Sequence, residues 1–452
     1  FALALGATDL EIGLIAAIPF LAQLAHVPAL VLISRERERR RLTVVCAALS
    51  RALFLAMALL PLLSLPLRPV HALVPLLVAY ALLATVAGAS WQVWVRELVP
   101  RDRLGRYFGR RMAFLSATGL VTLLAAGQGI AWIQRERPDL EGPAFATLFA
   151  LGALAGFASA AILARAPSLP VSTRHAPSFP ESLKRPFADR NYRRLLVFLA
   201  AWGFAANVAL PFVSVVLLRT LGYGLGVVAL FAALSQLANI LGLRLWAPLT
   251  DRYGNKPVLG LSASVFLLAT LVFAFTPKVE GAAILAAATL AHALWGFALA
   301  GLDVASNGIV MKLAPEDEAP GYLASASLVK AMAAGAAPLL AGLAATLLAD
   351  HSLAIRFAWG SAEGESVVTA IRLAQHDFLF LASVLLGLYA THRLLGFHEE
   401  GEATEDAVVR AMRREVTGPT SVAGLRQFAH VASYVVEAAY KFETQLLPDK
   451  RR

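Results

Sequence analysis

Three charged residues, Arg244, Asp303 and Lys330, each lie inside a long apolar stretch of the sequence. Charged side chains at membrane depth are energetically costly, so they are default candidates for function. Counted from the polar residues that end each stretch, all three lie about 10 to 13 Å inside the same side of a membrane, at 1.5 Å per helical residue. We expect one charged cluster that binds an anionic group or works a gate. The alternative is an internal ion pair that only fastens the helices.

The stretch that contains Asp303 also has a polar stripe. If His292 is position i, then Trp295, Leu299, Asp303 and Ser306 are positions i+3, i+7, i+11 and i+14. This spacing places all five on one narrow face of a helix. A face that mixes His, Trp and Asp is unsuited to lipid. It predicts either a wall that faces a substrate or a helix interface with one satisfied core histidine.

Four uncharged polar residues lie near the middle of other apolar stretches, namely Gln128, Asn207, Gln236 and Asn239. We expect them to complete a neutral polar pocket together with the stripe. The alternative is that each one only forms a hydrogen bond between neighbouring helices.

Other kinds of chemistry have no support in the sequence. It contains no metal-ligand spacing, nucleophile elbow, phosphate loop or pair of catalytic carboxylates. We therefore expect no enzyme activity, no metal and no cofactor. The single cysteine, Cys46, excludes an internal disulfide. The net charge of +10 comes from basic residues in short gaps between apolar segments, which argues against a nucleic-acid partner.

The composition predicts an all-α integral membrane protein. Of 452 residues, 58% are hydrophobic and only 15% charged, with a mean hydropathy of +0.66. A helix needs about 20 apolar residues to cross a bilayer, and the chain offers eleven such stretches. We expect helices at about 12–33, 42–65, 71–95, 112–134, 143–164, 195–218, 225–247, 257–276, 282–310, 322–349 and 378–397. The apolar fragment before Asp9 is too short to span, and we expect it to be the end of a truncated first helix.

The basic residues indicate an orientation. If alternate loops lie on alternate sides, one side holds 30 of the Lys and Arg residues and the other side 7. Because Lys and Arg concentrate on the cytoplasmic side of membrane proteins, both termini are expected in the cytoplasm. We expect the bilayer to be the cytoplasmic (inner) membrane of a bacterium.

The sequence repeats itself once, at a constant offset. The segment 94–108 aligns with 309–323, matching Pro100 with Pro315 and Tyr107 with Tyr322. This predicts two six-helix bundles related by pseudo-twofold symmetry. The expected halves are 1–165 and 195–397, joined by a cytoplasmic linker at 166–194 and followed by a tail at 398–452. The same offset predicts that roughly 20 to 25 residues precede Phe1 in the native chain.

The segment APLTDRYGNK, residues 247–256, resembles the loop signature GxxxDRxGRK of the major facilitator superfamily. The resemblance extends over residues 1 to about 397 and implies twelve helices around a central cavity. It also implies a cytoplasmic latch between the halves, formed by Asp251, Arg252, Gly254 and Lys256, with Asp251 facing the start of the helix near Met112. In the first-half copy, Glu36 and Arg37 stand where Asp-Arg belongs. An ordinary solvated loop is the alternative for that pair.

The resemblance implies a secondary transporter that moves a small, unidentified solute by alternating access. The alternative is a non-transporting membrane subunit or assembly factor with the same fold, which would bind partners through its tail. Residues 419–442 of that tail are expected to form an amphipathic helix on the membrane or on a partner protein. The stretch from Asp350 to Asp377 is expected to be a long, irregular outer loop.

Overall fold

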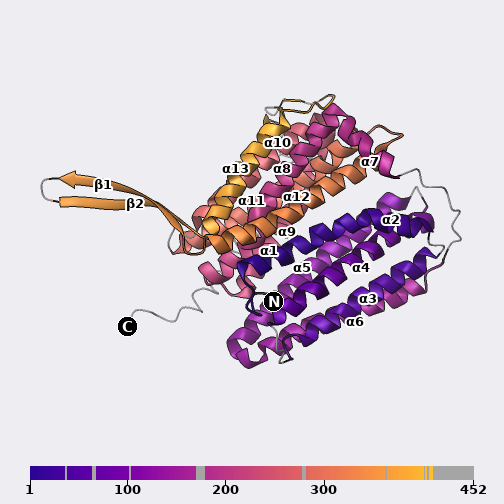
Figure 1. The fold of residues 1–452 in the computed structure, drawn as a ribbon, viewed down its shortest axis with the longest axis horizontal. Helices are drawn as coiled ribbons and strands as arrows, with labels where there is room; N and C mark the ends of the chain where they lie inside the picture. The colour runs from indigo at the N-terminus through magenta and orange to yellow at the C-terminus, as the bar shows by residue number, and fades with distance from the viewer. Residues whose placement is uncertain are drawn as a thin grey trace, which may run out of the picture.

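The computed structural model describes residues 1–35, 38–63, 68–100, 103–168, 179–276, 281–361, 364–401, 403–404 and 407–410. Ten helices in these ranges are long and apolar enough to cross a membrane. Figure 1 shows them as two bundles that lie side by side. The expected tail helix at 419–442 and the pair Glu36-Arg37 lie outside the described residues.

The first bundle consists of α1 (Asp9–Ala22), η1 (Gln23–Ala25), α2 (His26–Arg35), α3 (Arg39–Leu59), α4 (Pro69–Leu98), α5 (Leu104–Glu136), η3 (Pro138–Leu140) and α6 (Glu141–Ala164). The first expected span is divided into α1, η1 and α2. Pro28 explains this break, because proline lacks the N–H that would bond to the carbonyl of Leu24 and its ring crowds that carbonyl.

The second bundle follows the short linker helix α7 (Phe179–Ala188). It consists of α8 (Arg190–Val215), the π-helical turn η4 (Val216–Thr220), α9 (Leu225–Tyr253), α10 (Asn255–Phe275), α11 (Ala282–Lys312), α12 (Ala319–Leu347) and α13 (His376–Leu394). We call the end of the helices nearest α7 the linker side. The opposite end is the hairpin side, after the β-hairpin found there (Figure 1).

The internal repeat is visible in the helix positions. α5 begins at Leu104 and α12 at Ala319, which is the same offset as between Pro100 and Pro315. In the same way, α3 and α4 recur near this offset as α10 and α11. α6 and α13 depart from this offset, because a segment is inserted before α13. That segment is the β-hairpin.

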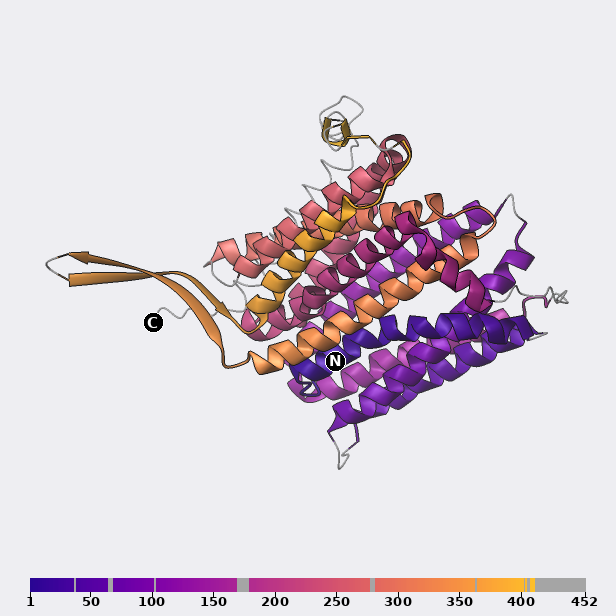
Figure 2. The same cartoon turned by 45° about the horizontal axis from the view of Figure 1, so that its top comes forward.

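The insertion differs from the expected irregular loop. Strands β1 (Ser352–Ser361) and β2 (Gly364–Ala374) form an antiparallel hairpin that projects beyond the helix ends in both views (Figures 1 and 2). In β1, Leu353, Ile355, Phe357 and Trp359 alternate with small or basic residues and are exposed, Trp359 by 81%. Alternation with a period of two is the signature of a strand, so the sequence contained this signal.

The two halves meet closely on the hairpin side. A β-carbon added at Gly13 of α1 would collide with the carbonyl oxygen of Pro338 in α12, and one at Gly342 would lie 2.6 Å from the carbonyl oxygen of Asp9. In the same way, Gly127 of α5 meets Ala229 of α9. Small residues let helix backbones approach this closely. The hairpin side is therefore closed.

The linker side is open between the halves. A cavity of about 470 Å³ separates the first-half residues Gln23, His26 and Gln92 from Leu323 and Ser327 of α12. The structure thus combines a closed hairpin side with an open linker side, which is one of the end states that alternating access requires.

The residues after α13 return to the linker side of the second bundle, where Glu399 is fully buried. Its carboxylate accepts hydrogen bonds from the side chain of Asn255 (2.9 Å), the backbone N–H of Lys256 (2.7 Å) and Nζ of Lys312 (2.9 Å). Burial raises the pKa of Glu399, but these hydrogen bonds outweigh it and hold the pKa below its ordinary value. Glu399 therefore ties the start of α10 to the end of α11.

We expect the substitution Glu399→Gln to lower the stability of the protein by about 1 to 3 kcal/mol at pH 7, because it removes a charged acceptor from three donors. Since the folded pKa is depressed, this stabilisation is present above the ordinary carboxyl pKa and is lost as the pH falls through the folded value. In lipid nanodiscs, the variant should have a lower unfolding temperature than the wild type at pH 7.5. This difference in unfolding temperature should narrow in acid. The exposed neighbour Glu400, changed to Gln, is the control. If Glu399→Gln has the same unfolding temperature as the wild type at pH 7.5, Glu399 does not have this role.

Candidate functional site

A cavity of about 550 Å³ lies in the second bundle between α8, α9 and α11. Its size suits a small solute. Six residues singled out in the sequence line it, namely Gln236, Asn239, His292, Trp295, Leu299 and Asp303. Four of the five stripe residues of α11 therefore line a cavity, whereas Ser306 does not. Ser214 of α8 and Ser235 of α9 add hydroxyl groups that the sequence analysis had not singled out.

Most hydrogen-bond donors of this cavity are already used by backbone carbonyl groups. Ser235 Oγ donates to the carbonyl of His292 (2.8 Å), and the side-chain amide of Asn239 donates to the carbonyl of Gly296 (3.3 Å). His292 Nδ1 lies 2.7 Å from the carbonyl oxygen of Ala288 and must donate to it, because that oxygen can only accept. The polar atoms of the lining that remain free to bind a ligand, among them His292 Nε2, are mainly hydrogen-bond acceptors.

An aromatic cluster holds the histidine in place. The ring of His292 is stacked on Phe231 with centroids 4.8 Å apart, and Phe273 and Trp295 approach it edge-on. Trp295 is buried and donates its indole N–H to Thr270 Oγ1 at 3.0 Å. His292 and Trp295 thus pack against neighbouring helices and also line the cavity, so the stripe has features of both a helix interface and a cavity wall.

Asp303 is the exposed, charged end of the stripe. The charge of Lys330 on α12, which is only partly exposed, acts on the Asp303 carboxylate. The two charges therefore interact, and the shared charged cluster stays a prediction.

Arg244 does not join this pair. It is exposed and lies outside the cavity lining. It follows the lining residue Asn239 by five positions, and five steps of 100° turn its side chain about 140° away from the cavity. The equal depths of the three residues had predicted contact between them. The depth of a residue does not determine how its helix is rotated, and the rotation of α9 places Arg244 outside the shared cluster.

Gln128 forms a hydrogen bond between helices, which was the alternative explanation, whereas Asn207 bonds within its own helix. Gln128 on α5 donates to the carbonyl of Gly226 on α9 at 3.0 Å, so it joins the two halves on the hairpin side. Asn207 donates to the carbonyl of Gly203 within its own helix at 2.8 Å. Neither residue lines the α8–α9–α11 cavity.

The latch residues lie at the turn between α9 and α10. Gly254 has a φ of +92°, a conformation that side chains other than glycine rarely adopt, which explains the glycine of the signature. Asp251 and Arg252 are exposed on the open linker side. Lys256 Nζ lies over the ring of Phe397, and its backbone N–H binds Glu399.

The first bundle contributes polar residues that the sequence analysis missed. Gln23, His26 and Gln92 line both a 400 Å³ cavity between α1 and α4 and the opening between the halves. Single polar residues in apolar stretches were the available signal, but only the packing shows which of them face the opening.

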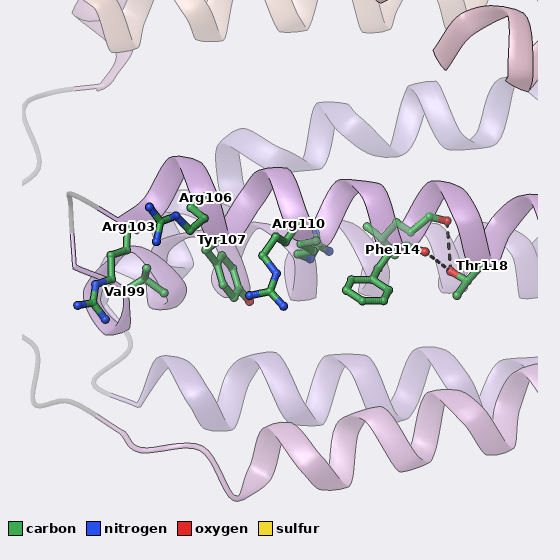
Figure 3. Close-up of a pocket in the computed structure, with 9 residues that line it drawn as sticks. Val99, Arg103, Arg106, Tyr107, Arg110, Phe114 and Thr118 are labelled. Carbon is green, nitrogen blue, oxygen red and sulfur yellow. Dashed lines mark hydrogen bonds between the residues drawn. The ribbon is translucent and has the colours of Figure 1, made fainter. Parts of the chain in front are cut away.

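A larger cavity, about 870 Å³, is a groove along α5 that Figure 3 shows in close-up. Its lining comes from one helix and the residues just before it, including Arg103, Arg106, Arg110 and Arg111. No facing helix adds convergent polar groups to this lining, whereas three helices surround the smaller cavity at Asp303. The smaller cavity is therefore the better candidate for a binding site.

Residues 1–338 match the family model of the Major Facilitator Superfamily. The chain belongs to this superfamily. It is an integral membrane protein and a secondary transporter, and the alternative of a non-transporting subunit is not favoured. Among curated proteins, none matches the sequence.

Solved structures of other superfamily transporters are similar to the chain. The nucleoside transporter NupG is 14% identical over 87% of this chain and 91% of that one, with a TM-score of 0.61. The xylose transporter XylE from E. coli, in an inward open conformation, is 13% identical over 89% of each chain, with a TM-score of 0.60. A bacterial homologue of the lysosomal transporter Spinster, inward-facing, is 15% identical over 98% and 91%, with a TM-score of 0.57. At these identities the likeness shows the fold alone.

Proposed function

We propose that this transporter carries a small, neutral solute rich in hydroxyl groups, bound in the cavity between α8, α9 and α11. The observation that supports the substrate class is the hydrogen-bond inventory of the lining. Because Ser235, Asn239 and His292 donate to backbone carbonyls, they offer acceptors to a ligand. A ligand rich in donors satisfies such a lining, and a ligand rich in acceptors leaves buried groups unpaired.

The charge of the site supports a neutral solute. Asp303 adds two strong acceptor oxygens to the lining, and the positive charge of Lys330 offsets its negative charge. Trp295 and the apolar residues Leu210, Val213 and Leu299 supply a surface for the carbon skeleton. Monosaccharides, polyols and the ribose of nucleosides fit this description. The transporters of xylose and of nucleosides with the same fold agree with it.

The orientation belongs to the same proposal. The linker side holds the loops rich in Lys and Arg, so it faces the cytoplasm by the positive-inside rule. The structure then represents an inward-open state in a bacterial cytoplasmic membrane. The halves 1–165 and 195–397 rock about the cavity, and Asp251 with its neighbours latches the linker side when the cavity faces outward.

A ligand panel tests the substrate class. Purified protein in detergent is heated with sugars, polyols and nucleosides, and in parallel with carboxylic acids and amines. Ligand binding raises the unfolding temperature, and a hydroxyl-rich neutral compound should do so at millimolar concentration. The substitution Asn239→Ala should abolish the shift, whereas the matched amide outside the cavity, Asn207→Ala, should keep it. Stabilisation by acids or amines alone would overturn the proposed class.

A further inference from the structure

An ionic cluster around a buried carboxylate joins the two halves on the hairpin side, outside the lining of the cavity at Asp303. Its centre is Asp9, the first residue of α1, which is only 8% exposed. Asp9 Oδ1 lies 3.3 Å from a guanidinium nitrogen of Arg219 in η4. Asp9 Oδ2 accepts a hydrogen bond from Gln375 at 2.7 Å and lies 3.4 Å from His376 Nε2. One carboxylate of the first half thus meets three polar side chains of the second.

The backbone around these partners is unusual. Gln375 is the only residue other than glycine with a positive φ, 38°, among the described residues. Arg219 lies in the π-helical turn that ends α8, and it also donates to the carbonyl of Ala7 at 2.5 Å. Strained residues and π-turns persist where surrounding contacts hold them, and they cluster at functional sites. Both irregularities here present side chains to Asp9.

Alternating access requires the hairpin side to open, and opening must pull α1 away from η4 and α13. We propose that Asp9, together with Arg219, Gln375 and His376, forms a charge lock that holds the hairpin side closed while the cavity faces the linker side. The proposal rests on alternating access and is independent of the substrate class.

The neighbouring charges show why Asp9 and not the adjacent acid has this role. Glu11 caps the start of α1, with its carboxylate hydrogen-bonded to Thr8. Its other partners, Arg68 and His71, belong to the first half, at 3.4 and 3.2 Å. Both acids favour the start of a helix through its dipole. Of these two acids, only Asp9 connects the halves. Substituting each in turn therefore distinguishes a lock from simple helix stabilisation.

The test measures the distance between the halves on the hairpin side. Spin labels are attached at Asp139→Cys, in the turn between α5 and α6, and at Asp350→Cys, after α12, in a Cys46→Ala background. Cys46 is the single native cysteine and both label sites are exposed. Electron–electron double resonance on the full chain in lipid nanodiscs then gives the populations of closed and open hairpin sides.

We expect Asp9→Asn to raise the ratio of open to closed molecules about tenfold, equivalent to about 1.4 kcal/mol. Arg219→Gln should act in the same direction, and it tests the lock independently if the Asp9 variant fails to fold. Asp9→Glu, which retains the charge, should stay nearer to the parent. Glu11→Gln should leave the distances unchanged.

Two results would overturn the proposal. One is that Asp9→Asn and Arg219→Gln give the same distances between the spin labels as the parent protein. The other is an equal opening in Glu11→Gln, which would reduce Asp9 to a helix-stabilising residue. Loss of ligand binding in the cavity would not bear on the lock, so this proposal and the substrate assignment can fail separately.

Discussion

Replacing Asp303 by Asn should reduce transport by about 10- to 100-fold, because a hydrogen bond to a charged acceptor contributes about 1.5 to 3 kcal/mol. Asp303 is exposed to the cavity, so its loss should leave abundance and unfolding temperature near those of the wild type. Uptake into proteoliposomes, using whichever compound stabilises the protein, gives the rate. Lys330→Ala should have a smaller effect, since it leaves the acceptor oxygens in place.

The structural alternative predicts a different pattern. If Asp303 and Lys330 only fasten the second bundle, Asp303→Asn strands a partly buried cation and should deplete folded protein. The exposed acid Glu316, changed to Gln, is the control for charge on the linker side. Normal abundance with lost transport supports a transport site, and lost abundance supports the structural role.

Replacing Gly13 by Ala should shift the protein away from the closed hairpin side. The added β-carbon collides with the carbonyl oxygen of Pro338, which belongs to a helix backbone and cannot rotate away. Overpacking of this kind costs about 1 to 3 kcal/mol, so the open population should increase about 10- to 100-fold and transport should slow. The labels described for the charge lock report the populations.

Gly152→Ala provides the control for the glycine prediction. Gly152 also lies within a helix, α6, but a β-carbon there would have nothing within 4 Å. Since alanine is the better helix former by about 1 kcal/mol, this variant should be neutral or slightly more stable. If Gly13→Ala behaves like Gly152→Ala in distances and transport, the close contact between α1 and α12 does not govern closure.

The sequence by itself determined the membrane helices and the duplication. A bilayer requires about 20 apolar residues for each spanning helix, and this local requirement appears as composition. The aligned segments of the repeat predicted that α5 and α12 would begin at equivalent positions of the two halves, as they do. Helical spacing also placed His292, Trp295 and Asp303 on one face, because residues on a single helix have fixed relative positions. The positive φ of Gly254 explains the glycine in the family signature.

The tertiary structure alone decided which faces meet. The sequence predicted equal depths for Arg244 and Asp303, but the rotation of α9 about its axis turns Arg244 out of the cavity. Asp9, Arg219 and His376 are distant in sequence, and no local pattern linked them before the halves packed. The close approach at Gly13 was equally invisible, since a glycine in a helix shows its purpose only beside its neighbour. Sequence periodicity fixes positions along and around one helix, whereas contacts between helices depend on how whole surfaces fit together.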